Sequence, residues 1–214
     1  MKRILAAALA LTATPALAHH PLAGAPMETL THGVLSGVGH PILGFDHLFF
    51  IIAVGIAAVF TGRSLTAPLG YVAGMLAGVA LILGGVALPA VELVIALSLL
   101  IVGAILMTGR GLALPTALVL FGLLGVFHGW AFGVSLAGQE AALGGGVIVG
   151  YLIGLAVTQW LIAIAAGYAM RKVWGAVSAD AIQSRLAGGL VAGVGAFLVL
   201  EAAEGAAFSA LGLG

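Results

Sequence analysis

His40, Asp46 and His47 stand at the point where the chain becomes purely apolar. Five residues separate the first histidine from the aspartate, and the run from Leu48 to Phe60 that follows carries no charge. Ionisable side chains beside such a run are costly in a membrane, so they indicate a functional site. Imidazole and carboxylate groups together are ligands for divalent transition metals. We therefore expect this stretch to capture a metal ion.

The geometry of a helix limits how these three side chains can share an ion. Asp46 and His47 are adjacent, so in a regular helix they project about 100° apart. Pro41 and Gly44 both interrupt helices and supply an irregularity at this point. We predict that His40 and His47 bind the ion directly. Asp46 either binds it as well or accepts the N–H of an imidazole.

The composition is that of an integral membrane protein. Of 214 residues, 63% are hydrophobic and 7% are charged, against about 25% charged in a soluble domain. The absence of cysteine excludes disulfides and thiolate metal sites. The net charge is zero, and no basic patch suits nucleic acid. No Gly-x-x-x-x-Gly-Lys-Ser/Thr stretch indicates ATP hydrolysis.

Residues 1–18 have the features of a secretory signal peptide. The apolar segment Ile4 to Leu11 is too short to cross a bilayer, and the small-x-small sequence Ala16-Leu17-Ala18 follows it. Cleavage would leave His19 and His20 at the mature N-terminus, where a terminal amine and imidazoles could chelate a metal. Alternatively, the peptidase requires only the small residues and these histidines have no role.

Six apolar stretches make up most of the remaining chain. We predict an all-α fold in which residues 19–214 form one domain, a polytopic bundle of six transmembrane helices. Residues 21–43 are amphiphilic, and Thr29 to Val38 could form a short helix at the interface or dipping into the membrane. The predicted spans are 44–61, 66–87, 89–109, 113–137, 143–170 and 185–211.

Many of the 34 glycines recur four residues apart, a spacing that lets helix backbones approach closely in lipid. We expect most of them to serve packing. The sets are Gly74 with Gly78, Gly129 with Gly133, Gly146 with Gly150 and Gly154, and Gly189 with Gly193.

Basic residues after the signal peptide fall on alternate connections between the spans. These connections face the cytoplasm by the positive-inside rule, so both mature termini would lie in the periplasm and the protein in the cytoplasmic (inner) membrane of a bacterium. The residues are Arg63, Arg110, Arg171, Lys172 and Arg185.

Further polar residues fall in the outer half or at the midplane of the predicted spans, which describes a polar funnel open to the outside. Glu92 opens the third span at its outer end, and His128 lies about 13 Å deep in the fourth. The carboxylate of Glu92 could instead cap its helix, and a single buried histidine often only satisfies a hydrogen bond. The remaining candidates are His32, Gln159, Glu201 and Glu204.

Three segments together resemble the HupE/UreJ family. They are His40 to His47 followed by Ala53-Val54-Gly55, Val91-Glu92 with Ile95-Ala96-Leu97-Ser98, and Phe127-His128-Gly129-Trp130-Ala131. The resemblance covers the whole chain. It implies a nickel or cobalt permease that supplies hydrogenase, urease or cobalamin assembly. On that resemblance the metal-path residues are His40, Asp46, His47, Glu92 and His128.

This chain departs from the family pattern at several positions. Family members often carry a glutamate after the fourth-span motif and a histidine in the fifth span, whereas the matching positions here are Phe132, Ser135 and Gln159. Glu140, Glu201 or Glu204 could compensate for the missing ligands.

We therefore expect a secondary permease that captures Ni²⁺ or Co²⁺ from the periplasmic side, holds no prosthetic group and delivers the ion to cytoplasmic metallochaperones. Neutral imidazoles are the ligand form, so uptake should weaken as the pH falls through about 6.5. One alternative is a membrane metal-binding protein that assists hydrogenase or urease maturation without transport. Another is a permease for a different divalent metal.

An enzyme is not expected. An intramembrane serine protease would need a base within reach of its serine. The sixth span contains no histidine, and the segment Gly133 to Gly138 lacks a Gly-x-Ser-Gly turn.

The signal peptide gives a direct prediction. Because Ala16-Leu17-Ala18 fits the geometry of signal peptidase, intact-mass spectrometry of purified protein should find His19 as the first residue. Detection of an uncleaved Met1 to Ala18 would show instead that this segment is retained.

Overall fold

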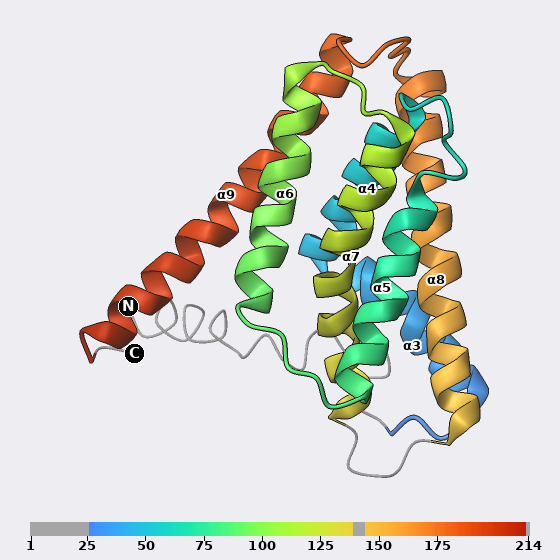
Figure 1. Cartoon of the computed structure of the whole chain (residues 1–214), viewed down its shortest axis with the longest axis vertical. Helices are drawn as coiled ribbons and strands as arrows, with labels where there is room; N and C mark the ends of the chain where they lie inside the picture. Colours follow the sequence, from blue (N-terminus) through green and yellow to red (C-terminus); the bar gives the residue numbers. More distant parts are fainter. Residues whose placement is uncertain (1–25, 139–143, 213–214) are drawn as a thin grey trace, which may run out of the picture.

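The structure, a computed structural model, describes residues 26–138 and 144–212 (Figure 1). Within these ranges the chain forms seven α-helices and one π-helical turn, and no strand is present. The elements are α3 (Leu30–Leu43), α4 (Phe45–Val59), α5 (Pro68–Leu83), α6 (Val91–Thr108), α7 (Leu114–Ala137), α8 (Gly145–Tyr168), η1 (Ala169–Val173) and α9 (Ile182–Ala210).

The predicted all-α membrane bundle is confirmed, but the count of six spans is not. Each predicted apolar stretch contains one helix, α4 to α9. Among the helices of residues 26–138 and 144–212, only α6, α7, α8 and α9 are long and apolar enough to cross a membrane as single helices. The pair α3 and α4 would make a fifth span if it counts as one broken helix, and α5 is shorter, with 16 residues. The signal peptide lies outside the described residues.

The chain bends by 82° between α3 and α4. Gly44 stands at the bend with non-helical backbone angles (φ −82°, ψ 101°), whereas Pro41 lies inside α3. Gly33 of α3 packs against the backbone at Val147, near the start of α8, while Gly55 of α4 packs against Ala163, much further along α8. The two half-helices thus follow α8 in succession, and the expected short helix is part of the bundle.

This arrangement corrects the expected depth of Asp46 and His47. We expected them to open a span at its outer end. They instead begin α4 at the break, part of the way along the bundle, because α3 occupies the segment in front of them. Broken helices that meet inside a bundle are a recurring setting for ion sites in transporters.

The glycines that face neighbouring helices bring backbones into contact, as predicted. A Cβ on Gly74 would overlap the carbonyl oxygen of Gly122, and one on Gly129 would overlap that of Met75, so α5 and α7 are in backbone contact. The prediction is wrong for Gly189 and Gly193 of α9, where an added Cβ meets nothing within 4 Å. The other predicted positions that face a neighbour closely are Gly78, Gly133, Gly150 and Gly154.

The connections lie at two opposite ends of the bundle. Figure 1 shows the α4–α5, α6–α7 and α8–α9 connections at one end and the α5–α6 connection at the other. The basic residues that the sequence places on alternate connections lie on or beside the α4–α5, α6–α7 and α8–α9 connections. One of them, Arg185, donates from Nε to the carbonyl oxygen of Met107 at 3.0 Å and so ties the start of α9 to the end of α6.

This separation leads to a prediction of topology. Reporters fused after Arg63, Arg110 and Arg171 should read cytoplasmic and one at Gly138 should read external, since the basic end is retained inside. Paired alkaline phosphatase and green fluorescent protein fusions measure both sides. An external reading at Arg171 would contradict the arrangement.

The glycine contacts predict that the same substitution, glycine to alanine, changes stability by different amounts at two positions. Gly74→Ala inserts a methyl group against the backbone of Gly122, and overpacking of this kind costs about 1–3 kcal/mol. Gly193→Ala, the matched control, meets open space and should be neutral or slightly stabilising because alanine favours the helix.

Thermal midpoints of the two purified variants in one detergent compare these effects. Equal midpoints would show that the α5–α7 contact tolerates a side chain.

Candidate metal-binding site

Three histidines from three helices lie near the α3–α4 break, and two of them contact the ring of Phe132. His40 is in the last turn of α3, His47 is in the first turn of α4, and His128 is inside α7. The centre of the Phe132 ring is 5.3 Å from that of His40 and 4.2 Å from that of His47. The His47 and His128 rings are 4.9 Å apart. The α3–α4 break and the contact of α4 with α7 thus bring His128 next to His47, which is 81 residues earlier in the sequence.

His128 is held by hydrogen bonds at both ring nitrogens. Its Nδ1 lies 2.7 Å from Nδ1 of His47, and its Nε2 lies 2.9 Å from Oγ of Ser98 on α6. The ring is fully buried and stacks on Phe50, with ring centres 4.2 Å apart and planes at 20°. In this arrangement His128 supports His47 and does not offer a nitrogen to an ion.

Asp46 folds back over the first turn of α4 and meets its neighbour. Its Oδ1 accepts the backbone N–H of His47 at 2.8 Å, and its Oδ2 lies 3.9 Å from Nε2 of His47. Bonds from a divalent metal such as zinc to N or O ligands are about 2.0–2.2 Å long, so one ion could touch both atoms. Adjacent residues of a helix project about 100° apart, but the Asp46 side chain turns toward His47, so both groups can reach one ion.

A hollow of about 210 Å³ opens beside Asp46 between α4, α6 and α9. Three carboxylates from these helices line it, those of Asp46, Glu92 and Glu201, and the other lining residues are apolar. Converging charge of one sign between apolar walls raises the local concentration of the opposite ion. Asp46 belongs both to this hollow and to the contact with His47, so it connects the two.

His40 also contacts Tyr151 of α8. The Tyr151 hydroxyl lies 3.2 Å from Nδ1 of His40 and donates to the carbonyl oxygen of Phe132 at 2.8 Å. Tyr151 was not singled out from the sequence, and Ser98 was noted only within the segment Ile95 to Ser98, with no role at the site. Ser98 had a signal, a hydroxyl in the apolar segment Ile95 to Ser98, whereas an aromatic residue in a span gives none.

Two other candidates have structural roles. Gln159 is buried, accepts at Oε1 from the Tyr71 hydroxyl and donates from Nε2 to the carbonyl oxygen of Leu155. His32 lies in the first turn of α3, where its Nδ1 accepts the backbone N–H of Glu28 at 3.3 Å. The polar groups of Gln159 are therefore used within the bundle, and His32 stabilises the start of α3.

The structure separates the two glutamates of α9. Both are exposed, but only Glu201 lines the carboxylate hollow, and Glu204 does not. His19, His20 and Glu140 lie outside the described residues.

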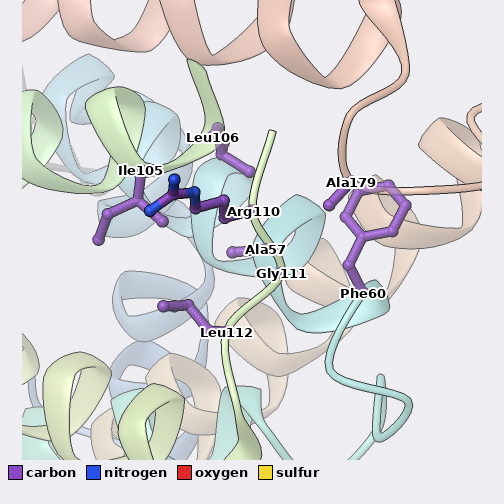
Figure 2. Close-up of a pocket in the computed structure, with 8 residues that line it drawn as sticks. All are labelled: Ala57, Phe60, Ile105, Leu106, Arg110, Gly111, Leu112 and Ala179. Atoms are coloured by element: carbon purple, nitrogen blue, oxygen red, sulfur yellow. The ribbon is translucent and has the colours of Figure 1, made fainter. Parts of the chain in front are cut away.

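At the opposite end of α4 and α6, hollows of about 390 and 460 Å³ lie beside Val59 and Met107. A cavity of about 10 Å³ lies there, between the ends of α4 and α6 and the residues that follow them. That is the room of about one water molecule. Figure 2 shows Arg110, Leu112, Phe60 and Ala179 among its lining residues, so a cation that reached this cavity would meet a guanidinium.

The residues do not form a finished metal centre. Across 26–138 and 144–212, no three His, Asp or Glu side chains converge closely enough to hold one ion. A site with two close protein ligands, such as His47 with Asp46, keeps its remaining coordination positions for water or for side chains that move.

Comparison with known proteins adds family context. The family model described as HupE / UreJ protein matches residues 7–198. The chain is 32% identical to Protein HupE of Rhizobium leguminosarum bv. viciae over 195 residues, which cover 90% of this chain and 95% of that protein. No solved structure matches the chain.

Proposed function

Because the chain belongs to the HupE / UreJ family, we propose that it is a secondary permease that takes up nickel or cobalt across the bacterial cytoplasmic membrane. The observation that carries the proposal is the position of Asp46, which lines the carboxylate hollow and also lies 3.9 Å from Nε2 of His47. A cation that binds Asp46 in the hollow is therefore already close to the imidazole of His47.

The order of steps follows from the chemistry of the ligands. Glu92 and Glu201 attract the hydrated ion into the hollow, where water can stay bound. Asp46 and His47 then replace part of the water shell, and nitrogen ligands favour nickel or cobalt over magnesium or calcium. His40, which also contacts the Phe132 ring, supplies a further imidazole when the rings move. Few and exchangeable ligands suit transport, since complete coordination would trap the ion.

In the proposed cycle, the hollow beside Asp46 faces outward and the end that carries Arg110 faces inward. Release requires α4 and α6 to separate near Phe60 and Leu106, which line the small cavity. The gradient, the membrane potential, protons or capture by cytoplasmic metallochaperones would supply the energy. No enzymatic reaction is assigned to the chain.

The contact of Asp46 with His47 also suits a second function, a membrane protein that binds metal for enzyme maturation and does not transport it. Accumulation of radioactive nickel and cobalt distinguishes the two in cells without other importers. A permease raises the metal content of the cytosol with time, whereas a binding protein adds only a fixed amount in the membrane fraction. Uptake no greater than in cells without the protein would exclude the permease.

Substitutions of His47, Asp46 and the glutamates of α9 should impair metal uptake to different extents. His47→Ala should abolish uptake because it removes the nitrogen ligand. Asp46→Asn should lower uptake about 10–100-fold, the usual effect of losing a carboxylate that supports a metal ligand. Glu201→Gln should raise the metal concentration for half-maximal uptake more than Glu204→Gln does, because only Glu201 lines the hollow.

Asp180→Asn is the matched control for Asp46→Asn. Asp180 lies in the α8–α9 connection at the basic end and accepts from the Ser178 hydroxyl, so its loss should leave uptake unchanged. Rates are compared at equal amounts of each variant in the membrane. Parental uptake by both His47→Ala and Asp46→Asn would contradict capture at this site.

A further inference from the structure

Two buried hydroxyl groups stand behind the histidines and share one arrangement. Each lies beside an imidazole nitrogen, and each donates its own proton to a backbone carbonyl. Ser98 donates to the oxygen of Ile95 at 2.6 Å and lies 2.9 Å from His128 Nε2. Tyr151 donates to the oxygen of Phe132 at 2.8 Å and lies 3.2 Å from His40 Nδ1.

The proton of Ser98 determines the protons of two imidazoles. A hydroxyl has one proton, and an oxygen 2.6 Å from the Ile95 oxygen requires that proton between them. The Ser98 oxygen is therefore the acceptor for His128, and His128 carries N–H at Nε2. Because a charged ring at a fully buried position is costly, His128 is neutral and its Nδ1 has the lone pair.

The same reasoning continues to His47. Two nitrogens 2.7 Å apart need one proton between them. Since Nδ1 of His128 is the acceptor, Nδ1 of His47 is the donor. In the neutral ring of His47 the remaining nitrogen, Nε2, then has the lone pair, and it is the atom 3.9 Å from the Asp46 carboxylate.

Tyr151 acts on His40 in one step. Its proton is used by Phe132, so its oxygen accepts from Nδ1 of His40, and Nε2 of His40 has the lone pair. Tyr151 is fully buried, so bulk water does not compete for this bond.

We propose that Ser98 and Tyr151 are positioning residues that hold His47, through His128, and His40 in the Nδ1–H form, so that Nε2 of each ring binds the metal. The inference rests on the proposed function for the identity of the cargo. It assigns roles to two hydroxyls that do not touch the ion, and it makes His128 a link between Ser98 and His47. Which ring nitrogen binds a metal is set by the hydrogen bond that the other nitrogen makes.

The test reads the ring protons directly in metal-free protein. The full chain with His19, His20 and His32 replaced by Asn keeps three imidazoles. It is labelled with ¹⁵N-histidine, placed in lipid nanodiscs and measured at pH 8, above the usual imidazole pKa of about 6.5. Two-bond ¹H–¹⁵N spectra distinguish Nδ1–H from Nε2–H rings. We expect His40 and His47 as Nδ1–H and His128 as Nε2–H; His47 as Nε2–H would overturn the proposal.

Substitutions of the two hydroxyls should act separately. Ser98→Ala should change the signals of His128 and His47 and spare His40, whereas Tyr151→Phe should change His40 alone. Tyr71→Phe is the matched control, because the Tyr71 hydroxyl donates to Gln159 and not to an imidazole. Ser98→Thr, which retains the hydroxyl, should restore the parental spectrum. A spectrum of Ser98→Ala identical to that of the parent would contradict the role of Ser98.

Calorimetric titration with Ni²⁺ separates this inference from the proposed function. Ser98→Ala should weaken binding about 10–100-fold, and Ser98→Thr should bind like the parent. If the parent binds neither Ni²⁺ nor Co²⁺, the proposed function fails whatever the ring forms are. If the parent binds Ni²⁺ and Ser98→Ala binds it equally well, the metal site stands and the positioning role fails.

Discussion

A helix can be interrupted inside a membrane only if the backbone groups released by the interruption find partners within the protein. At Gly44 this requirement is met locally. The Gly44 N–H donates to the carbonyl oxygen of His40 at 3.0 Å, and the Gly44 carbonyl accepts from Leu48 at 2.8 Å. Asp46 accepts the N–H of His47. The motif residues thus supply hydrogen-bond partners for the backbone at the break, and the break in turn brings both His40 and His47 into contact with Phe132.

The break also requires neighbours that approach very closely. Gly33 and Gly37 of α3 lie against the backbone of α8, and Gly55 of α4 lies against Ala163 further along α8. Small residues at such contacts are how helices associate where no hydrophobic driving force exists between them. Because the contacts are between backbones, neither half-helix can slide along α8 without displacing a neighbouring backbone, and the angle at Gly44 is held from both sides.

The sequence was informative about elements and less so about their arrangement. Apolar stretches predicted α4 to α9, since apolar length is a local property. The depth of Asp46 and His47 could not be predicted, because it depends on α3 joining the bundle, and residues 21–43 are not apolar enough to indicate that. Spacing predicted close packing at Gly74 and Gly129 but not the open face at Gly193, because a repeat does not say which side of a helix has a neighbour.

For the site, residue types identified His40, Asp46, His47 and His128 as candidates, since ionisable groups in spans are rare. The residues that hydrogen-bond to these histidines could not be predicted. Ser98 and Tyr151 are ordinary residues for a membrane helix, and only the contact of α6 with α7, and of α8 with α3, makes them neighbours of imidazoles. Gln159 shows the converse, because a polar residue in mid-span is used for a helix contact with Tyr71.

The bonds from Ser98 to His128 and from His128 to His47 cross three helices, α6, α7 and α4, with heavy-atom distances of 2.9 and 2.7 Å. Hydrogen bonds of this kind weaken beyond about 3.2 Å, so a separation of α6 from α4 by roughly an ångström would break the series. The spacing of the helices and the orientation of the His47 ring are therefore thermodynamically coupled. Such coupling is reciprocal: whatever fixes the ring favours one spacing of the helices, and whatever moves the helices alters how firmly the ring is held.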